Sequence, residues 1–141
     1  MYRMEKLSFL LSSTLESVGQ LEAAAEELAM EAGLDEDTRF KVALAVREAA
    51  INAMMHGNQY HAEKRITASF ERTDVALIFV IADEGNGFDF ERLPDPLAPE
   101  NILRGTGRGI FLIRSFMDQV NFSRLNPGTE LKMTKDIVST R

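Results

Sequence analysis

The chain of 141 residues contains no cysteine, and its only histidines are His56 and His61. Without thiols the protein can form neither a disulfide framework nor a thiolate metal centre, and two histidines alone cannot complete a zinc site. Basic residues are outnumbered, because 16 Lys and Arg stand against 22 Asp and Glu, which gives a net charge of −6. Nucleic-acid binding draws most of its affinity from clustered basic side chains, so we expect no direct nucleic-acid partner.

Long apolar runs are missing as well. The N-terminus leads only into a short stretch at residues 7–12 that serines interrupt. This stretch is too short and too polar for a signal-peptide core or a membrane span. We therefore expect a cytoplasmic protein that does not enter a membrane. The sequence contains no internal repeat, and its length suits one domain, which we assign to residues 1–141.

Hydrophobic periodicity predicts a strand and two helices in the first half of the chain. Residues 7–12 are expected to form the strand, and Thr14 to cap a helix that runs to about residue 31. A second helix, capped by Asp35 or Asp37, is apolar around most of its circumference and ends at about Gly57. A helix of this kind belongs in the protein interior.

The second half predicts two hairpins separated by a helix. Residues 66–70 and 75–82 form the first pair of strands, residues 110–117 the helix, and residues 120–122 and 131–133 the second pair. Strands and helices do not alternate regularly, which disfavours a doubly wound parallel sheet. We expect an α/β (α+β) two-layer sandwich, in which helices cover one face of a mostly antiparallel mixed sheet.

Three polar side chains interrupt the second predicted helix at four-residue spacing: Glu48, Asn52 and His56. This spacing places them on one face of a helix that otherwise resembles a core element. Buried polar groups need partners, so the row favours a cleft in which a ligand or ion supplies some of them. The alternative is a solvated stripe on a half-exposed helix.

A second polar cluster, Asp83, Gly85 and Gly87, follows the buried strand predicted at residues 75–82. A carboxylate at the end of a strand can accept a hydrogen bond from an exocyclic amine, and the glycines let the backbone approach a flat ring. The alternative is an acidic turn without a ligand. Residues 83–104 have little periodicity and the length of a functional lid or a flexible loop.

A glycine-rich segment precedes the last predicted helix, at Gly105, Thr106, Gly107, Arg108 and Gly109. Backbone N–H groups at a helix N-terminus favour a phosphate, and Thr106 and Arg108 can add donors. A flexible hinge is the alternative. The segment is not a dinucleotide fingerprint, because Ile110 stands where the third glycine is required, and the chain contains no G-x-x-x-x-G-K-[ST] loop.

In this order the three clusters resemble the ATP-binding motifs of the GHKL (Bergerat) superfamily, in the form found in anti-sigma-factor serine kinases. The segment from Glu48 to Gly57 resembles the N box, Asp83 to Asp89 the G1 box, and Gly107 to Asp118 the G2 box with its helix. Gly128-Thr129-Glu130-Leu131 is similar to the closing strand motif. The kinase subgroup is favoured by the single-domain length, the N-A-x-x-H-G spelling and the lack of a helix with a phospho-accepting histidine.

The resemblance implies a role for each motif in a Bergerat ATP-binding fold with a lid at about residues 88–105. Asn52 would be the Mg²⁺ ligand, Glu48 the general base, and Asp83 the acceptor for the adenine amino group. The other residues implied in cofactor binding are His56, Gly85, Asn86, Gly87, Gly105, Thr106, Gly107, Arg108, Gly109 and Thr129.

Arg108 departs from the subgroup pattern, which more often has an aliphatic residue or methionine at this position. Its guanidinium could neutralise the γ-phosphate, face a partner protein, or pair with an acidic residue such as Glu100. The departure bears on kinase activity more than on nucleotide binding.

The resemblance also implies cofactors and partners. ATP and Mg²⁺ would be the cofactors, a STAS-type anti-anti-sigma protein would be phosphorylated on serine, and a sigma factor would be sequestered. A homodimer is expected by the same resemblance. Two other functions stay open, namely a histidine-kinase-type ATPase domain with another substrate and a GHKL interaction module without kinase activity.

Overall fold

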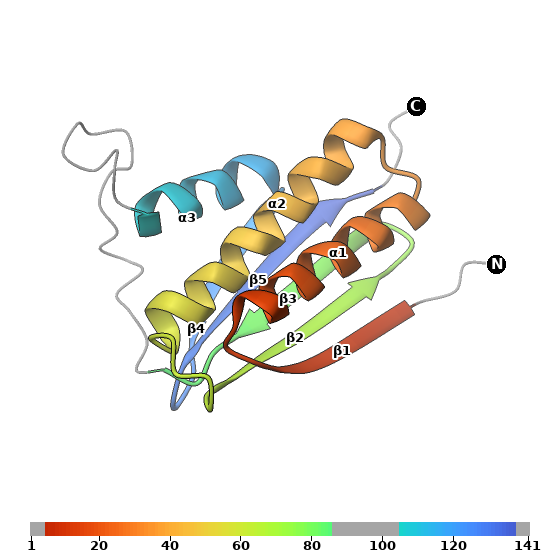
Figure 1. Ribbon diagram of the computed structural model, residues 1–141. Coiled ribbons are helices and arrows are strands. Elements are labelled where there is room, and N and C mark those ends of the chain that lie inside the picture. The colour runs from red at the N-terminus through yellow and green to blue at the C-terminus, as the bar shows by residue number, and fades with distance from the viewer. Residues whose placement is uncertain (1–4, 86–104, 138–141) are drawn as a thin grey trace.

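The structure is a computed structural model that describes residues 5–85 and 105–137 (Figure 1). The elements follow in the order β1 (Glu5–Ser12), α1 (Leu15–Glu31), α2 (Glu36–Asn52), η1 (Ala53–Gly57), β2 (Arg65–Arg72), β3 (Ala76–Ala82), α3 (Gly105–Phe116), β4 (Gln119–Arg124) and β5 (Thr129–Asp136). The predicted order of strands and helices is confirmed. No helix in these described ranges has the length and apolarity needed to cross a membrane.

The five strands form one sheet in the order β1-β2-β3-β5-β4, and α1, α2 and α3 cover one of its faces (Figure 1). This arrangement confirms the two-layer sandwich. Every pairing among the described strands is antiparallel, so the expected mixed character of the sheet was wrong. Hairpins account for two of the four pairs, because they join β2 to β3 and β4 to β5 and a hairpin makes an antiparallel pair.

Side-chain caps fix the starts of the first two helices. The Thr14 side chain accepts a hydrogen bond from the Ser17 N–H at the N-terminus of α1. Asp35 accepts from the Thr38 N–H at 2.8 Å, so Asp35 rather than Asp37 caps α2. Each cap satisfies an N–H group that the helix itself leaves without an acceptor.

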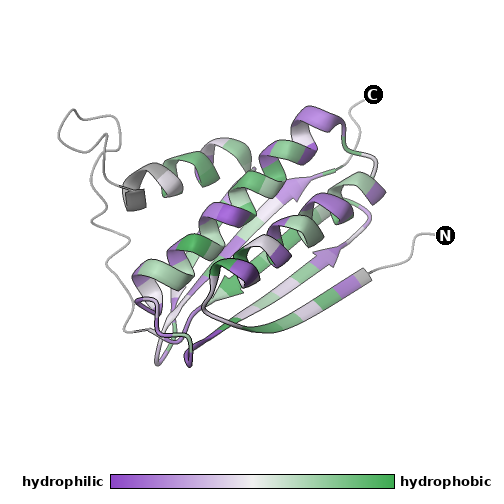
Figure 2. Cartoon of the chain, viewed as in Figure 1, coloured by the Kyte–Doolittle hydropathy of each residue, from purple (hydrophilic) through white to green (hydrophobic). Residues whose placement is uncertain are grey.

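α2 lies between α1 and α3 on the sheet and packs against both. Its buried side chains are mostly small, including Ala45, Val46, Ala49 and Ala50, which lets the neighbouring layers approach closely. Figure 2 shows α2 in apolar colours over much of its length, with hydrophilic bands between them. The helix is therefore internal, as predicted, and it carries polar residues into the middle of the fold.

The end of α2 differs from a regular helix. After Asn52 the chain continues as the π-helix η1, and the Asn58 N–H closes this wider turn on the Ala53 carbonyl at 2.8 Å. Short π-helical turns within helices often occur at functional sites. Here the turn brings Gly57 against the side chain of Asp83, which follows β3.

The last helix starts earlier than its apolar pattern predicts. We expected it at residues 110–117, whereas α3 runs from Gly105 to Phe116 and includes the backbone of the glycine-rich segment. Glycine has a low helix propensity, so the sequence pattern marks the helix only where apolar periodicity begins. The predicted lid residues 88–104 lie outside the described residues.

Candidate functional site

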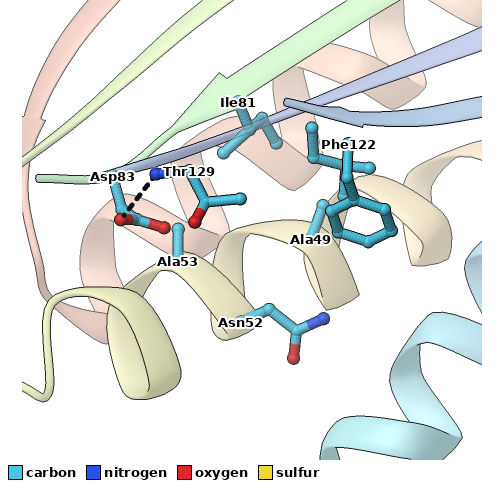
Figure 3. Close-up of a pocket in the computed structure, with 8 residues that line it drawn as sticks. Ala49, Asn52, Ala53, Ile81, Asp83, Phe122 and Thr129 are labelled. Atoms are coloured by element: carbon cyan, nitrogen blue, oxygen red, sulfur yellow. Dashed lines mark hydrogen bonds between the residues drawn. The ribbon is translucent and has the colours of Figure 1, made fainter. Parts of the chain in front are cut away.

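A small cavity lies between the C-terminal end of α2 and the neighbouring ends of the central strands (Figure 3). The residues that line it come from α2, η1, β3 with the residue after it, β4 and β5: Ala49, Asn52, Ala53, Ile81, Asp83, Phe122, Thr129 and Leu131. Its free volume is about 10 Å³, which is room for about one water molecule. A purine ring is larger than this enclosed space, so it would have to extend toward solvent or displace the surrounding side chains.

Asp83 is the charged residue of this cavity, and its side chain is held by the backbone. Its Oδ1 accepts hydrogen bonds from the N–H groups of Gly85 at 2.9 Å and Thr129 at 3.2 Å. The residue is only 6% exposed, and burial raises the pKa of its carboxyl, although both N–H groups and the charge of Lys64 oppose the shift. Because Oδ1 accepts both backbone bonds, Oδ2 is the oxygen left to accept from a ligand.

Close backbone approaches surround Asp83. A Cβ added at Gly57 would collide with the Asp83 carboxyl group, first with its carbon and Oδ2, and one added at Gly128 would collide with the Asp83 carbonyl oxygen. Gly128 also has a φ of +111°, which other residues rarely adopt. A Cβ at Gly85 would in turn collide with the Gly57 carbonyl oxygen. The carboxylate therefore sits in a cradle that only glycines can build.

Asn52 and Glu48 stand one turn apart on α2, as the sequence spacing predicts. Asn52 is 6% exposed, and its Nδ2 has no hydrogen-bond partner among the residues that the structure describes. Glu48 is half-buried, and desolvation raises the pKa of its carboxyl against the opposing charge of Arg47. A nearby cation would stabilise the half-buried Glu48 carboxylate, and a ligand acceptor would satisfy the Asn52 Nδ2 donor.

The N-terminal half of α3 approaches these two side chains at Gly109. A Cβ at Gly109 would lie 2.9 Å from Glu48 Oε1 and 3.7 Å from both polar atoms of the Asn52 side chain. The structure therefore brings Glu48, Asn52 and Gly109 together, although Gly109 is far from the other two in the sequence. The absence of a side chain at Gly109 leaves its backbone close to the carboxylate and the carboxamide.

Thr129 supplies a second polar atom without a partner. The residue is 4% exposed, its N–H donates to Asp83, and its Oγ1 makes no hydrogen bond with any described residue. Figure 3 shows the Thr129 hydroxyl beside Asp83, with Asn52 on the facing helix. The Asn52 carboxamide points toward α3, so the two buried polar atoms without described partners lie on different sides of the site. Each favours a polar ligand over a packed core.

The other predicted residues are placed less directly. His56 lies in η1, half-buried, and does not line the cavity; burial lowers the pKa of its imidazole. Gly105, Thr106, Gly107 and Arg108 form the first turn of α3, where only the backbone is described. Asn86 and Gly87 lie outside the described residues.

Across the described ranges, no three His, Asp or Glu side chains are grouped so that they could hold a metal ion.

Sequence reasoning missed several residues of the site. Ile81, Phe122 and Leu131 form the apolar walls of the cavity, but they read only as strand residues in the sequence. The alternation along 120–124 gives Phe122 an inward face without showing that a cavity lies there. Asn58 carries no role in the sequence motifs, although its side chain is fully buried.

The sequence profile of the histidine kinase-like ATPase domain matches residues 11–135, most of the chain. The chain belongs to this family. The match confirms the resemblance to GHKL proteins and covers the cavity, α2 and the α3 segment together. In this histidine kinase-like ATPase domain, the residues of the cavity and those around Asn52 all fall within the matched range.

Two kinds of relatives match this ATPase-like domain. The serine-protein kinase RsbW of Staphylococcus epidermidis is 39% identical over 101 residues, which cover 67% of this chain and 63% of that protein. The anti-sigma F factor of Bacillus subtilis (strain 168) is 31% identical over 140 residues, which cover 96% of this chain and 93% of that protein. The chain thus spans less than two thirds of the RsbW relatives and nearly all of the anti-sigma F factor.

A solved structure supports the fold. The crystal structure of the RsbU and RsbW domains of Rv1364c from Mycobacterium tuberculosis matches with a TM-score of 0.63 and 16% identity. The match covers 93% of this chain and 32% of that chain. At this identity the likeness confirms the fold of the domain and leaves its activity to other arguments.

Proposed function

We propose that this domain binds Mg-ATP and acts as an anti-sigma factor and serine-protein kinase of a bacterial partner-switching system. The observation that carries the proposal is the convergence of Glu48, Asn52 and Gly109 beside a cavity whose carboxylate is Asp83. A carboxylate, a carboxamide whose Nδ2 has no partner among the described residues, and a helix approached near its N-terminus are groups suited to the positioning and charge neutralisation of phosphoryl transfer. The names of the relatives, serine-protein kinase and anti-sigma F factor, point to the same activity.

The adenine base would occupy the cavity next to Asp83. The Asp83 Oδ2 would accept the hydrogen bond of the exocyclic amine, and the Thr129 hydroxyl would complete the polar contacts, directly or through water. Ile81, Phe122 and Leu131 offer apolar surface to the faces of the ring. Polar groups in an otherwise apolar cavity are the usual composition of a specific small-molecule site.

The phosphates would lie between α2 and the first turn of α3. Bound Mg-ATP supplies the phosphoryl group and the charge that neutralises its oxygens. Asn52 fits the metal because its carboxamide oxygen is a hard ligand. Its Nδ2, which has no partner among the described residues, could donate to a phosphate oxygen. The backbone N–H groups at the start of α3 would face the phosphates, an arrangement that the helix dipole favours.

Glu48 would act as the general base that takes the proton of the attacking serine hydroxyl. Its raised pKa makes it a stronger base than an exposed glutamate, which suits proton abstraction. The proposal retains the sequence-based roles of the residues whose side chains the structure does not describe: Asn86, Gly87, Thr106 and Arg108. It also retains His56 as a cofactor-binding residue outside the cavity.

The proposed partners are proteins. A STAS-type anti-anti-sigma protein would be phosphorylated on serine, and a sigma factor would be held inactive; we also propose a homodimer in the cytoplasm. The direct test is incubation with labelled ATP and a STAS protein from the same genome, with the label expected on an acceptor serine. Bound ATP without transfer would indicate an interaction module, whereas label on a histidine would indicate a histidine-kinase-type domain.

Asp83→Asn tests the proposed adenine contact. The variant keeps an Oδ1 that can accept from Gly85 and Thr129, but it replaces Oδ2 with an NH₂ donor that faces the donor of the base. We expect the ATP affinity to fall by about tenfold to a hundredfold, with GTP affected less, because a donor is left unpaired in a buried site. Competition titrations of ATP and GTP measure both values.

Unfolding of the nucleotide-free Asp83→Asn variant provides the control. Burial raises the pKa of Asp83 in the folded state above its value in the unfolded state. The free energy of unfolding of the wild type therefore falls as the pH rises from the unfolded-state pKa through the folded-state pKa. The variant lacks this loss and should melt no lower than the wild type at pH 7. Equal ATP affinity in both proteins would remove Asp83 from base recognition.

A further inference from the structure

The side chain of Asn58 joins three segments of the chain near the cavity. The residue is 0% exposed and sits between η1 and β2, where Gln59 and Tyr60 follow with positive φ angles of 52° and 62°. This backbone path is unusual for residues other than glycine. It reverses the chain within a few residues and leaves the Asn58 amide facing inward.

Both the Nδ2 and the Oδ1 of the Asn58 side chain form hydrogen bonds. Its Nδ2 donates to Ser13 Oγ at 2.6 Å and to the Arg65 carbonyl at 3.0 Å, and its Oδ1 accepts from the Glu84 N–H at 2.8 Å. Ser13 Oγ in turn donates to the Lys64 carbonyl at 2.8 Å. One buried side chain therefore connects the β1–α1 turn, the start of β2 and the residue after Asp83.

The bond to Glu84 is made one residue beyond the last backbone bond between this segment and β5, in which the Asp83 N–H donates to the Thr129 carbonyl at 3.0 Å. The last β3 residue in the ladder with β5 is Ala82, paired with Glu130, so the Glu84 N–H has no strand partner. Asn58 accepts from this N–H, and Glu84 Oε1 accepts from the Arg65 N–H at 2.6 Å. These two bonds fix the backbone on the C-terminal side of Asp83, next to the contact with Gly57.

We propose that Asn58 is a positioning residue for purine recognition, which holds the turn after β3 so that the Asp83 carboxylate faces the cavity in one orientation. The inference rests on the proposed nucleotide site, since Asp83 is the group that would read the base. Asn58 does not line the cavity and acts only through the backbone of Glu84. A buried network in which every donor is used can fix a geometry in this way.

The test compares ATP and GTP binding in the wild type, in Asn58→Ala and in Leu28→Ala. Leu28 is buried in α1 and takes no part in this network, so its variant reports general destabilisation. We expect the ratio of the GTP and ATP dissociation constants to fall by about tenfold in Asn58→Ala, because the carboxylate loses its fixed orientation. Leu28→Ala should keep the wild-type ratio, although its melting temperature is lower.

A second measurement uses the wild type, in case Asn58→Ala does not fold. The Glu84 amide should exchange its hydrogen as slowly as amides of β3, although the side chain of Glu84 is exposed. An unchanged purine ratio in folded Asn58→Ala, or fast exchange at Glu84, would overturn the inference. A wild type that binds ATP and GTP equally would instead refute the proposed adenine site itself.

Discussion

Glu48→Gln is expected to bind Mg-ATP like the wild type and to lose phosphoryl transfer by about 10²-fold to 10⁴-fold. The amide keeps the size and the hydrogen-bonding shape of the carboxylate but cannot take the proton of a serine hydroxyl. Single-turnover transfer from labelled ATP to the STAS acceptor measures the rate, and a separate titration measures the affinity. Glu63→Gln, which removes the same charge from an exposed position, should behave like the wild type.

The pH profile distinguishes a base from a residue that only shapes the site. Burial raises the pKa of Glu48, so wild-type transfer should decline as the pH falls through a value above 4.5, the ordinary value of the group. The declining limb reports protonation of the base, and Glu48→Gln should lack it. If the variant transfers phosphate at the wild-type rate, Glu48 is not the base.

Asn52→Ala is expected to abolish the stabilisation of the protein by Mg-ATP. Ligand at 100 times its dissociation constant stabilises a folded protein by about 2.7 kcal/mol, which is a readily measured shift in melting temperature. The variant removes the proposed metal ligand, so its melting temperature should be the same with and without Mg-ATP. Differential scanning fluorimetry over a range of Mg-ATP concentrations gives the comparison.

The nucleotide-free variant should remain folded. Asn52 Nδ2 is buried without a partner in the described part of the chain, so truncation to alanine removes an unsatisfied polar group. Asn121→Ala, at an exposed position on β4, serves as the matched control and should respond to Mg-ATP as the wild type does. A full thermal shift in Asn52→Ala would contradict the metal role.

Local chemistry made much of the fold predictable. The caps at Thr14 and Asp35 and the strand patterns around residues 66–70 and 75–82 depend on near neighbours, and the structure confirms them. Strand ends were less accurate, since β5 runs from Thr129 to Asp136 while the pattern indicated only residues 131–133. Pairing with β3 and β4 extends this strand, and the sequence of the strand alone does not contain that information.

The part of the candidate site that lies on a single helix was predictable from the sequence. Glu48 and Asn52 are four residues apart, so helical geometry alone places them together. The approach of Gly109 and the enclosure of Asp83 by glycines from two other segments depend on tertiary packing. Asn58 shows the same limit, because an asparagine at a helix end usually serves as a cap and only the folded structure reveals its buried bonds.

The glycine cradle around Asp83 also determines which changes a mutational library can tolerate. In a library randomised at positions 57, 85 and 128, selection for folding and nucleotide binding should recover only glycine. Even a methyl group at these positions would collide with neighbouring atoms. Gly19, on the exposed face of α1, has nothing within 4 Å of an added Cβ and should accept alanine with a gain of about 1 kcal/mol. The glycines of this chain thus differ in their tolerance: those around Asp83 should not accept a side chain, whereas Gly19 should gain stability from one.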